Sequence, residues 1–478
     1  MSNRTSFNLQ VFGCFCFALI TCIRPTRNLP TVQAAAPDKW FGAGLLFILV
    51  VTCLAYAPSL SDPLLSDDYI LIHASANPSE LVRTITKPAG DGAMRPVGEL
   101  VFGTYKHWAH ENAAWWHSLD LALHLVNVAL LCWLSTRLRL GRYASLIACG
   151  LFALHPAHPE AVAWTSSTFD LLAALFSLAT LITLTSESRL TWIAASFLTV
   201  LAIFSKESAY ALPAIAILTF GGRRKAVFPC VLVAIALLIH RWQVFNGPGG
   251  CVDVATGQAQ LFSVTPFSTL KALLYRPWET LLLPIDWAVS PGLALKIMFS
   301  VMCMSLCVIA FRSRAPRHVH VFFTGCIIAS LIPPVHLALI GEDLQGTRVF
   351  YLPSIFFCIW MSQISRTWAF YGVAIVFSFL ALRHNLGIRS EVASLGKRAC
   401  SAGANAVVHS AGAISVKGLP RSINGIFFLA NGFEDCVRST SGNPSATVSL
   451  TDTTIVLPAL VWRSDLRELQ PIGPGVNP

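Results

Sequence analysis

Apolar runs alternate with short polar segments from residue 40 to residue 382. A helix needs about 20 apolar residues to cross the roughly 30 Å hydrocarbon core of a bilayer. By this measure the pattern predicts an all-α polytopic membrane protein with about eleven transmembrane helices. The runs are 40–58, 117–136, 143–157, 163–186, 190–205, 208–222, 226–244, 292–312, 319–340, 349–365 and 367–382.

The composition supports this interpretation. Of the 478 residues, 54% are hydrophobic and only 12% are charged, whereas a soluble domain carries about 25% charged residues. The net charge is +10, but the basic residues form short clusters between the apolar runs. This distribution is typical of membrane topology and not of a nucleic-acid-binding patch. We therefore expect the lipid bilayer, and no nucleic acid, as a partner.

The basic clusters predict how the runs are oriented. Cytoplasmic loops carry an excess of lysine and arginine, so a first span that starts inside leaves nearly every cluster on the cytoplasmic face. The polar segments on the opposite face are the loop 59–116, the stretch HPAHPE, the stretch SKES, the loop 245–290 and the stretch GEDLQGTR. The unusual polar residues of the chain are therefore expected together on the outer face.

The two ends of the chain differ from the apolar part. Residues 1–39 contain an apolar stretch that is short for a span and is a signal-like segment, an interfacial helix or an extension. Residues 385–478 are rich in β-forming residues and predict a small β-rich extracytoplasmic domain. The transmembrane domain is thus predicted at 40–384. Cys400 and Cys436 lie outside the apolar runs and can form a disulfide.

Two adjacent carboxylates, Asp67 and Asp68, stand near the start of the first outer loop. Such a pair is often a solvated turn or the N-cap of a following helix. Here the loop also holds Trp108, Trp115 and Trp116, and aromatic residues at this depth form an interfacial belt. A loop of this length without a spanning helix is usually functional. We therefore interpret the pair as candidate catalytic acids.

Four polar residues follow one another at spacings of three and four in the second predicted span. They are His117, Asp120, His124 and Asn127, and this spacing places them along one helix face. Polar residues inside a spanning helix normally face a partner or a wet cavity. Two interpretations stay open, namely hydrogen bonds that join helices and support for a site.

A cluster of His155, His158 and Glu160 stands with two prolines where a span ends. These side chains admit a divalent metal, although the prolines prevent the one-face helical geometry of a His-Glu-x-x-His site. The other interpretation is a rigid outer corner that carries hydrogen-bonding groups. No further cofactor is indicated.

Two cations are predicted on the same face as the acid pair. Lys206 stands beside Glu207 at the end of one span, and Arg348 stands at the mouth of a later one. A local ion pair with a snorkelling lysine explains the first. Both cations also suit a lipid phosphate, which arginine grips with two hydrogen bonds. Together they indicate a base opposite an anionic leaving group.

Six blocks occur in a fixed order over residues 60 to 355. They are LLSDDYILI, MRPVGEL, WWHSLDLALHLVNVALL, LFALHPAHPEAVAWTSSTFDLLAALF, LAIFSKESAYALP and GTRVFYLPS. In their order and number, these blocks resemble the polytopic family-C (GT-C) glycosyltransferases, specifically the transmembrane TPR-type O-mannosyltransferases and their bacterial relatives. The resemblance implies that a sugar is transferred from a polyprenyl-phosphate-linked donor to a protein or glycan acceptor.

The resemblance also implies roles and a location. The family's acidic pair at the reaction centre falls on Asp67 and Asp68, and its basic residue before the YLPS-like stretch falls on Arg348. The implied location is the bacterial inner (plasma) membrane, with the site facing the periplasm. The other positions that match family blocks are Arg95, Glu160, Lys206 and Glu207.

The sequence departs from the family pattern in three places. Thr168 stands where relatives more often carry an arginine before Phe-Asp, and Asp120 stands where an asparagine is usual. The TPR array is absent, and a short β-like tail takes its place. The first two departures affect which residues contact the substrate, and the third affects whether the acceptor is a protein.

These residues predict a single in-line displacement that inverts the anomeric centre. Asp67 acts as general base on the acceptor hydroxyl, Asp68 orients the acceptor or a cation, and two cations hold the departing phosphate. The alternatives are a transporter or flippase of a lipid-linked sugar, a scaffold that binds through its tail, and a related enzyme that glycosylates lipid or glycan. The residues expected to support the site are Arg95, His117, His124, His155, His158, Glu160 and Glu207.

Overall fold

The computed structural model describes most of the chain after residue 38. The N-terminal segment predicted at 1–39 lies outside the described residues except for its last position. The described residues are 39–74, 81–86, 93–186, 188, 190–222, 224–250, 265–312, 316–339, 343–365, 367–410, 412–429, 431–450 and 459–471.

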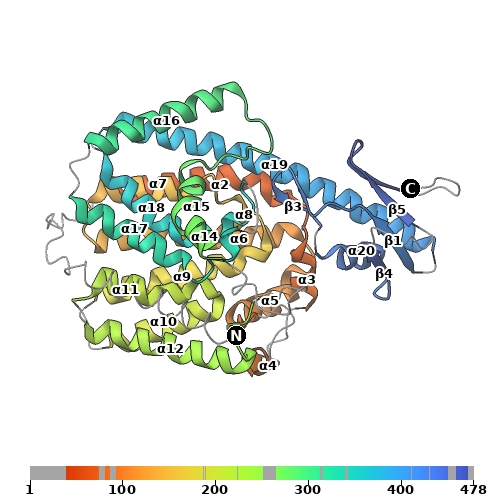
Figure 1. The fold of residues 1–478 in the computed structure, drawn as a ribbon, viewed down its shortest axis with the longest axis horizontal. Coiled ribbons are helices and arrows are strands. Elements are labelled where there is room, and N and C mark those ends of the chain that lie inside the picture. The colour runs from red at the N-terminus through yellow and green to blue at the C-terminus, as the bar shows by residue number, and fades with distance from the viewer. Residues whose placement is uncertain are drawn as a thin grey trace.

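Every predicted apolar run contains a helix, which confirms the all-α character of the apolar part. These helices lie side by side in one bundle (Figure 1). They are α2 (Lys39–Tyr56), α6 (Ala113–Arg137), α7 (Arg142–Ala153), α9 (Thr168–Leu184), α10 (Thr191–Ser205), α11 (Leu212–Phe220), α12 (Arg224–Phe245), α16 (Leu293–Arg312), α17 (Arg317–Leu331), α18 (Tyr351–Ile364) and α19 (Trp368–Val408).

Five of the described helices are long and apolar enough to cross a membrane, fewer than the eleven predicted spans. They are Trp40–Ser61, Ala113–Arg137, Thr165–Leu184, Lys225–Phe245 and Trp368–Val408. Five further apolar helices are shorter. Large apolar side chains such as Phe47, Ile239 and Met304 are exposed on the outside of the bundle. The fold is therefore compatible with a membrane protein.

Short helical turns occupy the polar corners between the long helices. After α7, the prolines of HPAHPE stop the helix, and Pro159 then starts the single turn α8 (Pro159–Val162). Lys206 has an extended backbone, which ends α10 before the next turn begins. The turns that follow such breaks are η3 (Thr165–Ser167), η4 (Glu207–Ala211), η6 (Leu337–Leu339) and η7 (Thr347–Phe350).

The two long polar loops also fold into short helices. Those of the first loop are η1 (Ala57–Ser61), α3 (Asp67–Ala74), α4 (Leu81–Thr86) and α5 (Pro96–Ala109), and those of the second are α14 (Pro266–Leu270), η5 (Lys271–Tyr275) and α15 (Arg276–Leu282).

The segments predicted on the outer face gather at one end of the bundle. The Asn385 side chain donates hydrogen bonds to the carbonyl oxygens of Pro156, at 2.7 Å, and Pro284, at 2.9 Å. Its own carbonyl oxygen accepts a hydrogen bond from the backbone of Asp286. Two polar segments that are distant in the sequence, the HPAHPE stretch and the end of the loop 245–290, thus meet at one side chain of α19.

The last helix of the bundle, α19, continues far beyond it. With 41 residues, its length is about 60 Å, twice the thickness of a bilayer core. Its second half carries the C-terminal domain away from the bundle (Figure 1). Residues 385–408 are therefore helical, and the predicted β-rich character is wrong for them. Residues 385, 389, 392, 396, 399, 403 and 407 are all buried, a spacing of three and four that is helical.

Strands do form after residue 412, as the sequence predicts. One sheet has the order β4-β1-β5-β6, in which β1 runs parallel to β4 and β5, while β6 is antiparallel to β5. Strands β2 and β3 form a separate hairpin. The elements are β1 (Ala413–Lys417), β2 (Ser422–Ile423), β3 (Ile426–Phe427), α20 (Phe433–Ser441), β4 (Thr447–Leu450), β5 (Ala459–Arg463) and β6 (Glu468–Pro471).

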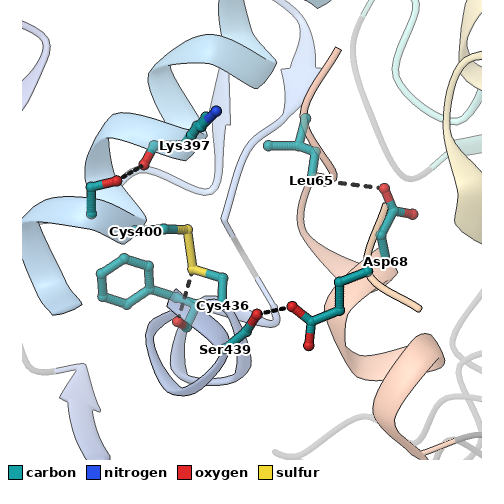
Figure 2. Close-up of a disulfide and its surroundings, with 9 residues drawn as sticks. Leu65, Asp68, Lys397, Cys400, Cys436 and Ser439 are labelled. Atoms are coloured by element: carbon teal, nitrogen blue, oxygen red, sulfur yellow. Dashed lines mark hydrogen bonds between the residues drawn. A yellow bond between two sulfur atoms is a disulfide. The ribbon is translucent and has the colours of Figure 1, made fainter. Parts of the chain in front are cut away.

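A disulfide between Cys400 and Cys436 joins α19 to α20 (Figure 2). The two helices pack closely beside it, because a Cβ atom at Gly403 would lie only 2.7 Å from a methyl carbon of Val437. The pairing that the sequence permitted is therefore formed, and it fixes α20 against the long helix.

We expect the disulfide to stabilise the C-terminal domain substantially. The bridge spans 36 residues, and closing a loop of that size contributes about 4 kcal/mol. Replacing both Cys400 and Cys436 by serine should accelerate proteolytic cleavage after residue 408 at least tenfold, roughly the effect of 1.4 kcal/mol. The exposed free thiol of Cys307 provides the control, since Cys307→Ser should leave the cleavage rate unchanged. Equal rates in all variants would contradict the expectation.

Candidate functional site

The acid pair begins α3, and Asp68 ties this helix to the bundle. Its carboxylate accepts a hydrogen bond from the backbone N–H of Leu65, at 3.0 Å (Figure 2), and another from that of Ser166, at 2.7 Å. Ser66, which precedes the pair, is buried and has a positive φ of 55°. Asp68 lies inside the first turn of α3 and accepts from Leu65, which precedes the helix, so this bond is not the N-cap considered for the sequence. Asp68 also binds the turn η3, which is distant in the sequence.

Burial changes the acidity of Asp68. The residue is 1% exposed, and loss of water raises its pKa from 3.8 to about 7. The two backbone hydrogen bonds and the charge of Arg389 oppose this rise, and the negative charge of Asp67 adds to it. A carboxyl group that titrates near neutrality is a candidate for proton transfer.

Asp67 points in another direction, toward the C-terminal domain. One of its carboxylate oxygens accepts a hydrogen bond from the side-chain amide of Asn431, at 2.9 Å. Within the described part of the chain, the other oxygen accepts none. Asp67 is only partly buried.

Trp164 connects the acid loop with the cations. Its indole N–H donates a hydrogen bond to the carbonyl oxygen of Leu65, at 3.0 Å. The guanidinium carbon of Arg348 lies 4.4 Å from the ring centroid, and that of Arg389 lies 5.4 Å from it. Both distances are within the range of cation–π attraction. One buried aromatic ring therefore holds two arginines beside the loop that carries the acids.

Glu160 positions the segment that carries Arg348. One of its oxygens accepts hydrogen bonds from the hydroxyl of Thr347, at 3.1 Å, and the backbone N–H of Arg348, at 3.3 Å. Its other oxygen lies 3.9 Å from the Arg348 side-chain nitrogen Nε. The corner HPAHPE thus fixes the mouth of the later helix.

Lys206 forms a buried ion pair with Asp170 of α9. Burial lowers the pKa of Lys206 to about 8, although the attraction of Asp170 opposes this change. The positive charges of Arg348 and Arg95 lower the pKa of Lys206 further.

Glu207 bridges two further arginines. Its carboxylate lies 3.0 Å from Nη2 of Arg95 and 3.3 Å from Nη1 of Arg241. Arg95 also lies 5.4 Å from the ring centroid of Phe169. The cations predicted from the sequence are therefore brought together, with carboxylates between them. We call Arg95, Lys206, Arg241 and Arg348 the basic cluster.

The four histidines expected to support the site bond to neighbouring segments. His117 contacts the carbonyl oxygen of Asp62 at 3.1 Å. His124 lies 2.7 Å from the Tyr351 hydroxyl, and His158 lies 2.9 Å from that of Ser354. The ring of His155 accepts a bond from a backbone N–H two residues later. These contacts favour the interpretation as bonds that join helices. Among the described residues, no group of three or more His, Cys, Asp or Glu is placed to hold a metal ion.

The two residues that depart from the family pattern contact each other. The hydroxyl of Thr168 donates a hydrogen bond of 2.5 Å to the carboxylate of Asp120, and both residues are fully buried. In this chain the two departures are thus one paired contact, next to the turn η3 that Asp68 binds.

Sequence reasoning missed four residues of this region. These residues lie outside the polar clusters from which the site was predicted, and they are Trp164, Arg241, Arg389 and Asn431. The burial of Arg389 follows from its helical spacing to the buried Asn385, four residues earlier. Asn431 precedes a glycine in a turn, and such dipeptides mark turns without indicating what they contact.

No family model matches this sequence, and no curated protein matches it.

The pKa of Asp68 predicts how stability depends on pH. The folded protein keeps a proton on Asp68 between pH 3.8 and about 7, where the unfolded chain has lost it. Stability contributed by this group therefore falls as pH rises through that range and levels off above it. Asp68→Asn should make the unfolding temperature in detergent less dependent on pH there. Asp67→Asn retains Asp68 and should keep the decline. A decline of equal slope in Asp68→Asn and wild type would contradict the assignment.

Proposed function

We propose that this chain is a membrane glycosyltransferase with a GT-C-like fold. It moves a sugar from a polyprenyl-phosphate-linked donor to the hydroxyl of a protein or glycan acceptor. The observation that carries the proposal is the placement of the acid pair and the basic cluster at one end of an apolar bundle, joined through Trp164. A lipid-linked donor requires this combination, because its tail lies in the bilayer while its phosphate and sugar lie at the surface.

In the proposed reaction, Asp67 is the general base. It takes the proton of the acceptor hydroxyl while that oxygen forms a bond to the anomeric carbon. The bond between this carbon and the phosphate oxygen breaks at the same time, so the configuration inverts and polyprenyl phosphate leaves. Among the described residues, the second oxygen of Asp67 accepts no hydrogen bond, which supports this role. Asp68 has both oxygens engaged by backbone N–H groups, and therefore holds the loop in place.

The basic cluster stabilises the leaving phosphate. The Arg348 side chain is 20% exposed, and we assign to it the direct contact with phosphate oxygens. Lys206 is 4% exposed and paired with Asp170. We therefore assign to it a contribution to the positive electrostatic potential from a buried position. In a site shielded from water, such fixed charges stabilise developing negative charge strongly.

The proposed location is a bacterial inner membrane, crossed about eleven times, with the site on the periplasmic face. Two observations support this sidedness. The disulfide Cys400–Cys436 lies at the end of the molecule that carries the site, and disulfides persist in oxidising compartments. At the other end, Arg137 bonds to the Thr185 hydroxyl, which is consistent with basic residues on the cytoplasmic face.

Removing the base tests the proposed chemistry. Purified protein should release polyprenyl phosphate from a radiolabelled polyprenyl-phosphate sugar when an acceptor is present, without any ion gradient. Asp67→Asn should lower the rate at least about 100-fold, the usual contribution of a general base. Asp465 is exposed in the β5–β6 turn, and Asp465→Asn is the matched control. Full activity of Asp67→Asn, or sugar translocation without transfer, would refute the proposal and favour a flippase.

The phosphate contact is tested separately by ligand-induced stabilisation. Polyprenyl phosphate should raise the unfolding temperature of the wild-type protein, because a ligand of the folded state stabilises it by mass action. Arg348→Ala should lose most of this increase, whereas the exposed Arg463 of β5 can be replaced by alanine without loss. Equal protection of the two variants would exclude Arg348 as the phosphate-binding residue.

A further inference from the structure

We infer that the C-terminal domain completes the catalytic site, with Asn431 as a positioning residue for Asp67. This inference rests on the proposed function, since it assigns a role in the reaction to a contact between the domain and the base. The domain holds α3 at both of its ends and is itself anchored to α19.

The first contact lies at the start of α3. Asn431 donates the hydrogen bond that fixes one oxygen of the Asp67 carboxylate, at 2.9 Å. The next residue, Gly432, packs so closely on the acid loop that a Cβ atom there would lie 2.2 Å from the carbonyl oxygen of Ser66. Only glycine permits this approach, and its φ of 74° also favours glycine. The pair thus orients the carboxylate and supports the backbone behind it.

The second contact lies at the end of α3. His73, in its last turn, lies 2.7 Å from a carboxylate oxygen of Glu111. The other oxygen of Glu111 accepts a hydrogen bond from the hydroxyl of Ser439 on α20. The hydrogen bond between His73 and Glu111 raises the pKa of His73 and lowers the pKa of Glu111. Glu111 therefore links α3 to the same helix that follows Gly432.

The C-terminal domain is in turn held by α19. The disulfide at Cys400 and the contact at Gly403 fix α20 to this helix. Earlier on α19, Ser390 donates a hydrogen bond of 2.5 Å to Asp62, just before the acid loop, and Arg389 lies beside Trp164. One continuous helix thus contacts both the site and the domain that positions the base, so the position of Asp67 is determined from both sides.

The neutral amide of Asn431 suits a positioning role. It donates to one carboxylate oxygen of Asp67 without adding a charge to the site. An aspartate at the same place would repel Asp67, and an alanine would leave its side chain free to rotate.

Kinetics of Asn431 variants test the inference. With Asn431→Ala, we expect kcat to fall about tenfold or more, as for other misplaced catalytic groups, while KM for the polyprenyl-phosphate sugar stays within twofold. Asn431→Asp should fall further. Asn405 is exposed on α19, and Asn405→Ala should match the wild type.

A pair of glycine variants separates positioning from folding. Gly432 and Gly442 flank α20 and both have positive φ, so alanine strains the backbone similarly at each. Only at Gly432 would the new Cβ press on Ser66, since nothing lies within 4 Å at Gly442. Gly432→Ala should lose activity while retaining the Cys400–Cys436 disulfide, and Gly442→Ala should keep activity.

The outcomes distinguish this inference from the proposed function. If Asp67→Asn keeps full activity, the proposed function fails. If Asp67→Asn is inactive while Asn431→Ala and Gly432→Ala keep the wild-type kcat, the proposed function stands and the inference is overturned. An equal loss in Gly432→Ala and Gly442→Ala would also overturn it, because the loss would then follow backbone strain alone.

Discussion

The pairing of buried charge at one end of an apolar bundle is the constraint on which the rest of the structure depends. Charge removed from water is costly unless it is paired and hydrogen-bonded. Lys206 is therefore held by Asp170, and Glu207 lies between two arginines. Because the partners come from different helices, each pairing also joins segments distant in the sequence. The site and the packing at this end of the bundle are thus products of the same contacts.

Much of this organisation was predictable from the sequence. The apolar runs indicate the helices, and helices that alternate in direction return their polar ends to the same two faces. Asp67, Glu160, Lys206 and Arg348 each stand at such an end, so their proximity follows from counting runs. Run lengths predicted eleven spans, but they do not show where polar corners shorten a helix, and five described helices are long and apolar enough to cross alone.

The residues that sequence reasoning missed act through tertiary contacts. Trp164 contacts Leu65 and two arginines, but none of these is close to it in the sequence. Asn431 lies far from Asp67 along the chain, and nothing local to either residue indicates that they meet. The composition of residues 385–408, which includes several glycines and serines, does not indicate the helix that they form, but their buried positions follow a regular helical spacing. Periodicity is therefore the better guide where the chain leaves the apolar bundle.

The length of α19 has a consequence for access to the acids. The helix contains no proline over its 41 residues and runs without a break from the bundle into the C-terminal domain. A rod of this kind has no hinge at which the domain can swing aside. Under the proposed function, substrates would therefore arrive laterally, the lipid-linked donor through the plane of the bilayer and the acceptor along the rim between bundle and domain. The C-terminal domain is therefore expected to stay in place against the bundle while substrates enter and leave.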